Sequence, residues 1–229
     1  YIDSTVGWRS IQDNVFADVG SNFISATGGT ESDSGNDRIH TFTGPGTFAV
    51  TSVSPCAANN LVSYMVVAGG AGSGGMTPNC NGGGGGGGAG GFREVKSPVT
   101  PYTASPLCGH GTPGNRITVT ATSFPITVGG GGAGKTPNAC RGGSGSNSQF
   151  STIIAAGGGG GGSGDCGGPA RNGGDGGSGG GGGSGPAAAG AGNSPPVTPS
   201  QGNSGGTSGG SPYAAGGGGG ATAAGTPSG

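Results

Sequence analysis

Hydrophobic residues gather in short runs, and four of these runs lead directly into glycine. The runs cover residues 61–68, 124–128, 151–156 and 212–215, and the glycine after them covers 69–70, 129–132, 157–162 and 216–220. A flexible linker has no need of a β-prone segment before each glycine run, because its residues pack against nothing. The repetition therefore predicts a small β-scaffold from which parallel glycine-rich segments extend.

The region before the first glycine run has the pattern of short strands. Residues 38–42 and 47–52 are β-prone and flank Gly44-Pro45-Gly46, which predicts a hairpin. Residues 61–68 are apolar on both faces and predict a strand that is buried on both sides. Residues 116–121 alternate between apolar and polar positions, which predicts a half-exposed strand.

Composition divides the chain into an entry arm, a β-strand scaffold and a region of glycine-rich tracts with interspersed strands, which cover residues 1–27, 28–68 and 69–229. The chain starts at Tyr1 without an initiator methionine, and we interpret it as part of a longer polypeptide. In the arm, Trp8, Ile11 and Phe16 are candidates for attachment to a neighbouring domain or subunit. An equal alternative is that they cover the base of the same domain.

Glycine and charge content bear on whether the tracts are ordered. The 229 residues include 65 glycines and 16 prolines, a composition typical of disordered or low-complexity chains. However, only 7% of the residues are charged, the net charge is −1 and the apolar residues are clustered, which argues against disorder. Poly-glycine adopts the polyproline II helix, which has no internal hydrogen bonds, so neighbouring tracts must bond to one another. We therefore predict a mostly β fold with a glycine-rich polyproline/polyglycine II helix bundle and essentially no α-helix, with floppy loops as the alternative.

The sequence contains no convincing motif for catalysis or cofactor binding, and we expect a protein that is not an enzyme and needs no cofactor. Residues 129–136 match the phosphate-loop pattern G-x4-G-K-[ST], but the residues after them cannot sustain the helix that such a loop must open. The arginines are isolated, which argues against nucleic acid as a partner. No apolar stretch approaches the ~20 residues that cross a bilayer. The cysteines and histidines match no metal-site spacing.

Five cysteines are many for a chain with so few core residues. The sequence leaves open whether they form disulfides or remain free thiols. Cys80 and Cys140 both lie in inserts that begin Thr-Pro-Asn. If the tracts before them are parallel neighbours, the two inserts emerge at one end. We therefore predict a Cys80–Cys140 disulfide, with Cys166 as the substitute partner for either cysteine.

The loops between tracts are candidates for recognition, because rigid scaffolds that present variable loops are a common design for binding. They lie within residues 76–80, 97–108, 136–141 and 194–199, and plain connection between tracts is the alternative. The candidate recognition residues are Met76, Thr77, Pro78, Asn79, Pro101, Tyr102, Leu107, Lys135, Thr136, Asn138 and Arg141.

Several strings together resemble the glycine-rich domain of tailed-phage virion structural proteins. They are Ile39-His-Thr-Phe-Thr-Gly-Pro-Gly-Thr-Phe48, Val62-Ser-Tyr-Met-Val-Val-Ala-Gly-Gly70, Gly90-Gly-Phe-Arg-Glu-Val95, Phe124-Pro-Ile-Thr-Val-Gly-Gly130 and Ser146-Asn-Ser-Gln-Phe-Ser-Thr-Ile-Ile154. A looser likeness is to the tail-fibre tip adhesins of T-even phages, in which stacked polyglycine II helices form a sandwich whose end loops bind an outer-membrane receptor.

The resemblance implies a non-enzymatic structural protein of the virion, carried on a tail fibre or other appendage. Its loops would contact a host outer-surface receptor or glycan, and its partners would be other virion proteins. It leaves homo-oligomer formation open. A capsid or filament decoration or stabilising protein without receptor binding is the alternative.

Overall fold

The computed structural model describes residues 23–76, 82–135, 140–164, 169–209 and 213–229, and the backbone of two short paired strands, β1 (Ile2–Asp3) and β2 (Gly7–Trp8). Within these residues the regular structure consists of β-strands and short 3-10 turns, and the predicted lack of α-helix is confirmed. The other strands are β3 (Ser25–Thr27), β4 (Thr30–Ser34), β5 (Asp37–Thr41), β6 (Gly46–Ser52), β7 (Tyr64–Val67), β8 (Phe92–Val95), β9 (Ser123–Thr127), β10 (Ser148–Phe150), β11 (Ile153–Ala155), β12 (Pro186–Ala187) and β13 (Ser208–Gly209). The 3-10 turns are η1 (Ala57–Asn60), η2 (Gly109–Gly111), η3 (Pro113–Asn115) and η4 (Pro169–Arg171).

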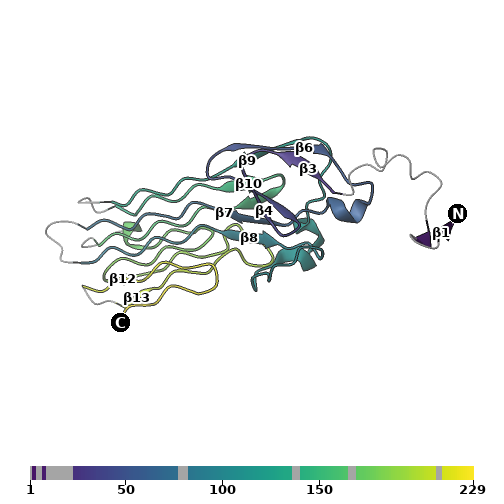
Figure 1. Ribbon diagram of the computed structural model, residues 1–229. Helices are drawn as coiled ribbons and strands as arrows, with labels where there is room; N and C mark the ends of the chain where they lie inside the picture. The colour runs from purple at the N-terminus through teal and green to yellow at the C-terminus, as the bar shows by residue number, and fades with distance from the viewer. Residues whose placement is uncertain are drawn as a thin grey trace.

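Five antiparallel strands form a sheet in the order β11-β10-β9-β6-β3, and the two-stranded ribbon β7–β8 packs against it (Figure 1). We call the sheet and the ribbon together the β-base. Tyr64 of the ribbon meets Phe150 of the sheet edge-to-face, with ring centroids 6.0 Å apart. Val66, Val95 and Ile153 are buried beside them, so the main hydrophobic core lies between ribbon and sheet.

Before the first glycine run, two strand expectations are wrong. β5 and β6 occupy the ranges of the expected hairpin, but β5 pairs with β4 and β6 lies between β3 and β9. In that position Phe48 lies opposite Phe124 and packs against the core, while β5 folds back on β4 across a two-residue turn and meets Phe48 through the His40 ring, edge-to-face at 5.0 Å between centroids. β7 was expected to be buried on both sides, yet Met65 and Val67 are exposed, because only one face of the ribbon meets the sheet.

The glycine tracts are ordered by hydrogen bonds between tracts, with a period of three residues. Tract 69–75 donates from every third amide to tract 140–146 and accepts at every third carbonyl from tract 157–164. These bonds are Gly69 to Ser146, Gly72 to Gly143 and Gly75 to Cys140, then Gly158 to Gly69, Gly161 to Gly72 and Gly164 to Gly75, at 2.7–3.0 Å. Three residues is the repeat of a polyglycine II helix, so the bonding favours that geometry, which stays a prediction.

Neighbouring tracts run in both directions, not in parallel alone. Tracts 69–75 and 157–164 are parallel, as expected, but Ala71 and Gly74 donate to Gly88 and Gly85, so the intervening tract runs antiparallel. The reason is connectivity: the chain must return from the far end to the β-base in order to form β8 (Figure 1).

Interior tract positions have no room for a side chain. A Cβ on Gly161 would lie 2.0 Å from the Gly85 carbonyl oxygen, and a Cβ on Gly158 would lie 2.1 Å from that of Gly88. Both obstacles are backbone atoms of the neighbouring tract, which cannot rotate away. Tract 157–164 therefore reaches hydrogen-bonding distance of its neighbours only because it is almost pure glycine.

The stability of the fold should depend on pH in the alkaline range, because Tyr64 is a buried phenol. Its hydroxyl donates a hydrogen bond to the Asn115 carbonyl oxygen at 2.6 Å, and burial raises its pKa from 10.0 to about 12. The folded state thus favours the neutral phenol. The stability from this effect is complete below about pH 10 and is lost as the pH rises towards about 12.

We therefore expect the melting temperature to fall between about pH 10 and 12, and to fall less steeply in Tyr64→Phe, although that variant starts lower because it lacks the hydrogen bond. Circular dichroism melts across this range test it. Parallel curves for the two proteins would contradict the assignment to Tyr64.

Candidate functional site

The ends of the tracts that point away from the β-base form one surface, which we call the tract tip. We define it by the described residues Met76, Lys135, Cys140, Gly164 and Tyr213, each of which borders a connection between tracts. Hydrogen bonds bring several of these borders together: Gly75 donates to Cys140 at 3.0 Å, Gly164 donates to Gly75 at 2.7 Å and Lys135 donates to Ser73 at 3.2 Å. The Tyr213 border lies nearby, since a Cβ on Gly83 would be 3.6 Å from the Tyr213 carbonyl oxygen.

Three candidate recognition residues lie at or beside the tract tip. Met76 and Lys135 are exposed there. Arg141 is exposed as well, and its Nε donates to the Asn172 carbonyl oxygen at 2.7 Å, which ties the side chain to the next tract. The other five candidates of these two inserts, Thr77, Pro78, Asn79, Thr136 and Asn138, lie outside the described residues.

The remaining candidates, Pro101, Tyr102 and Leu107, belong to the loop after β8 and lie beside the β-base, not at the tip. Glu94 of β8 holds this loop, because its Oε2 accepts hydrogen bonds from the amide of Ser105, at 2.9 Å, and from its hydroxyl. Burial raises the pKa of Tyr102 to about 12, and a hydrogen bond with the Glu94 carboxylate adds to the shift.

The fourth candidate loop, residues 194–199, also lies at the β-base, where Asn115 Nδ2 donates to the Thr198 carbonyl oxygen at 2.8 Å. The sequence analysis treated the four loops as one set of recognition candidates. The structure separates them into two surfaces, one at each end of the tracts.

Cys56, Cys108 and Cys140 have free thiols. The predicted Cys80–Cys140 disulfide is thus not formed in this structure, and Cys80 and Cys166 lie outside the described residues. The backbone explains how the end of tract 140–146 is held without a crosslink, since the Cys140 carbonyl already accepts the Gly75 amide. Of the attachment candidates, Trp8 belongs to β2, while Ile11 and Phe16 lie outside the described residues.

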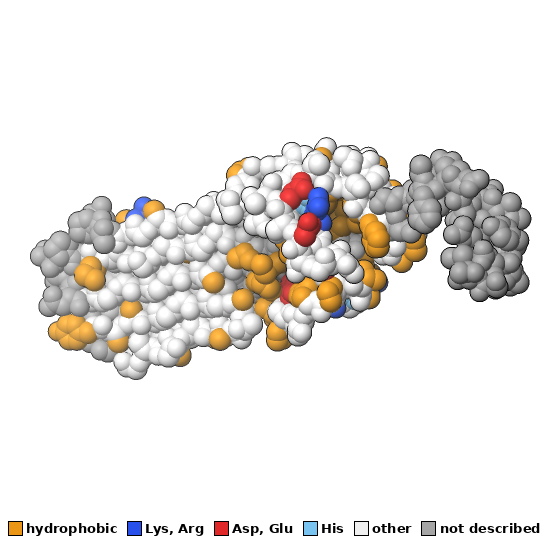
Figure 2. All heavy atoms as spheres, in the orientation of Figure 1, with side chains coloured by type: hydrophobic (Ala, Val, Ile, Leu, Met, Phe, Trp, Pro, Cys, Tyr) orange, Lys and Arg blue, Asp and Glu red, His pale blue; other side chains and the backbone are white. Residues whose placement is uncertain are grey.

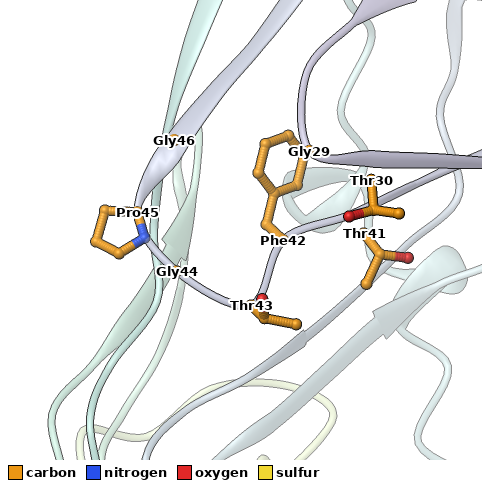
Figure 3. A pocket seen from close by; sticks show the side chains of 8 residues that line it. All are labelled: Gly29, Thr30, Thr41, Phe42, Thr43, Gly44, Pro45 and Gly46. Atoms are coloured by element: carbon orange, nitrogen blue, oxygen red, sulfur yellow. The ribbon is translucent and has the colours of Figure 1, made fainter.

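A recess beside the β4–β5 hairpin is a poor candidate for a small-molecule site. It is lined by Gly29, Thr30, Thr41, Phe42, Thr43, Gly44, Pro45 and Gly46 (Figure 3). Its volume of about 220 Å³ is below the ~300–1,000 Å³ of typical ligand pockets, and none of its lining side chains is ionisable. Nor do the described residues include a cluster of three or more His, Cys, Asp or Glu side chains that could bind a metal ion.

The described segments contain no helix with the length and apolar character needed to cross a bilayer.

Buried polar side chains are the residues that the sequence analysis missed. Arg93 of β8 is buried, donates to Asn115 Oδ1 at 2.6 Å and thereby joins the ribbon to η3. Gln201 is almost fully buried, and its amide group bridges the start of tract 157–164 and the 194–199 loop. An arginine within the otherwise β-prone run 92–95 was the available signal for Arg93, whereas nothing in the serine-rich surroundings of Gln201 marks it.

Comparison with known proteins agrees with the tract architecture. No curated protein and no solved structure gives a significant match to the chain. A family model described as a glycine-rich domain matches residues 41–229, which include most of the β-base and all the tracts. The chain therefore belongs to this glycine-rich domain family.

Proposed function

We propose that the chain is a non-enzymatic structural domain of a phage virion, carried on a tail fibre or other appendage, and that its tract tip contacts the host surface. One observation carries the proposal: the molecule has two unlike ends (Figure 1). The hydrophobic core and the strands of the β-base lie at one end, and the borders of several connections between tracts meet at the other.

This arrangement suits recognition on physical grounds. Tract 69–75 is bonded to four neighbouring tracts, so the loops that it helps to carry are attached to a stiff support. Binding by such loops loses less conformational entropy than binding by a free segment, which favours affinity. Met76 and Tyr213 give the tip exposed apolar surface, and Lys135 and Arg141 add positive charge. A host protein or glycan is a suitable ligand for this mixture, and other virion proteins would bind at the β-base.

Competition for adsorption tests the proposal. Purified chain added to host cells should slow adsorption of the phage that encodes it, because both would occupy the same receptor. A triple variant of the tip, Met76→Ser, Lys135→Ser and Tyr213→Ser, should compete less well. Ile39→Ser is the matched control, since Ile39 is an exposed apolar residue on the β4–β5 hairpin, outside the tract tip. Equal competition by the wild type and the tip variant would contradict recognition through this surface.

Gold-labelled antibodies against the chain locate it on the virion. Label at the ends of fibres supports the proposal, whereas label over the shell, together with no competition for adsorption, would favour the decoration or stabilising protein.

A further inference from the structure

The outward face of the β7–β8 ribbon is an exposed apolar surface. Met65 is 67% exposed and Val67 is 49% exposed, although both lie on a strand whose alternate residues are in the core. Phe92, which is opposite Val67 in the ladder, is only half-buried. Figure 2 shows hydrophobic side chains gathered where the strands enter the tracts, while the tracts themselves carry few.

The loop after β8 extends this surface. Glu94 lies opposite Met65 in the ladder and forms a hydrogen bond with Tyr102, which places Tyr102 beside Met65. Thr100 Oγ1 is 2.7 Å from the hydroxyl of Ser63, two residues before Met65. Between these contacts, Val99 is 72% exposed and Tyr102 is 40% exposed. We call Met65, Val67, Val99 and Tyr102 the ribbon patch. Contiguous apolar surface of this kind usually marks an interaction site.

Residues 1–22 have the composition, charge and reach of an occupant for the ribbon patch. They contain the large apolar residues Tyr1, Ile2, Val6, Trp8, Ile11, Val15, Phe16 and Val19 in a chain that otherwise has few. Their three aspartates and one arginine give a net charge of −2, and a cation lies beside the patch, since Lys96 Nζ is 5.9 Å from the centroid of the Tyr102 ring.

Geometry and tethering favour the arm of the same chain over a second copy. Residues 1–22 join the β-base at Phe23, next to the edge strand β3, and 22 extended residues reach up to ~70 Å. A segment attached at this distance meets the patch at an effective concentration of roughly millimolar, far above that of a second molecule in dilute solution.

We propose that residues 1–22 pack their apolar side chains against the ribbon patch of the same chain. The sequence left two alternatives open for this arm, attachment to a neighbour or cover for its own base, and the patch favours the second. Docking would remove Met65, Val67 and Val99 from water, and the burial of apolar area supplies the driving force.

Trp8 provides a built-in probe, because it is the only tryptophan of the chain and belongs to the arm. In the wild-type protein its fluorescence should be blue-shifted relative to the denatured chain and protected from iodide quenching. The double variant Met65→Ser/Val67→Thr should shift the emission back towards the denatured value and increase quenching several-fold. Val99→Ser is a second variant that tests the patch from the loop, and Ile39→Ser is the matched control, an exposed apolar residue outside the patch.

Each outcome decides the proposal. A melting curve for each variant shows that the β-base is folded, as expected for substitutions of exposed side chains. Emission of the wild type equal to that of the denatured chain would overturn the proposal, and so would protection of Trp8 that neither patch variant reduces. Protection that disappears on dilution would also overturn it, in favour of a second copy as the occupant.

Discussion

The variant Gly160→Val is expected to lower the free energy of unfolding by about 3 kcal/mol or more, since it breaks several hydrogen bonds worth ~1 kcal/mol each. A Cβ at Gly160 would lie 1.9 Å from the carbonyl oxygen of Gly142 and 2.7 Å from its carbonyl carbon. The two tracts must then separate, which stretches the bonds that join them, from Gly142 to Gly161 at 2.8 Å and from Gly145 to Gly158 at 2.9 Å. Against a total stability of ~5–15 kcal/mol this is a large loss, and thermal melting measures it directly.

Gly130→Val is the matched control. Gly130 also lies in a glycine tract directly after a strand, but a Cβ there would meet no atom within 4 Å. The melting temperature of this variant should stay close to that of the wild type. If both valine variants melt together, close packing of the tracts around Gly160 is refuted.

Gln201→Ala is expected to destabilise the protein by about 2–4 kcal/mol, because two buried backbone groups lose their partners at ~1–3 kcal/mol each. The Gln201 side chain is only 1% exposed. Its Oε1 accepts a hydrogen bond from the Ala156 amide, and its Nε2 donates one to the Pro195 carbonyl oxygen, both at 2.8 Å. Chemical denaturation of the wild type and the variant gives the difference.

Gln149→Ala is the control for this truncation. Gln149 is exposed, and its side chain makes a local hydrogen bond to the Ser151 carbonyl oxygen at 2.8 Å. Loss of this hydrogen bond should lower the free energy of unfolding by well under ~1 kcal/mol, since water replaces the Gln149 side chain as the partner of the carbonyl. A cost for Gln201→Ala no larger than that of the control would mean that the buried bridge contributes nothing.

The sequence could predict that glycine tracts begin directly after strands, because a β-prone run followed by glycine is a local signal. β7, β9 and β11 each lead into glycine where the hydrophobic runs end. In residues 116–121 the predicted burial pattern is confirmed in part: Ile117 and Val119 are buried and the polar residues around them are exposed, although Ala121 is exposed too. The strand predicted there is wrong, because the segment makes only an isolated bridge, from Thr118 to Leu61.

The sequence could not predict which glycine tracts bond to one another, because every tract has nearly the same sequence. Gly206 lies in a serine-rich stretch with no long glycine run, yet a Cβ there would lie 2.1 Å from the carbonyl oxygen of Thr226. The predicted pairing of β5 with β6 is wrong for a different reason, because β5 pairs with the preceding strand β4. Glu31 and Asp33 form ion pairs with Arg38 across the β4–β5 hairpin, at 3.3 and 2.9 Å. The two-residue turn Gly35-Asn36 was the local signal for this hairpin, and it competed with Gly44-Pro45-Gly46.

The positions of the candidate recognition loops could not be predicted from the sequence either. Composition marks residues 76–80 and 97–108 alike, as Pro- and Thr-containing inserts. Which end of the tracts each one occupies depends on chain direction: the first insert follows a tract that leaves the β-base, whereas the second follows β8, where the chain has returned.

The three-residue period of the hydrogen bonds sets a rule for how the length of a tract can change. Gly158, Gly161 and Gly164 all donate to one neighbour, so deletion of a single residue before them would turn the later amides about a third of a turn away from their acceptors. Deletion of three would return them to the same neighbour, one repeat along. Insertions and deletions between β-base and tip are thus tolerable only in triplets, and the connections at the tip are free of this constraint.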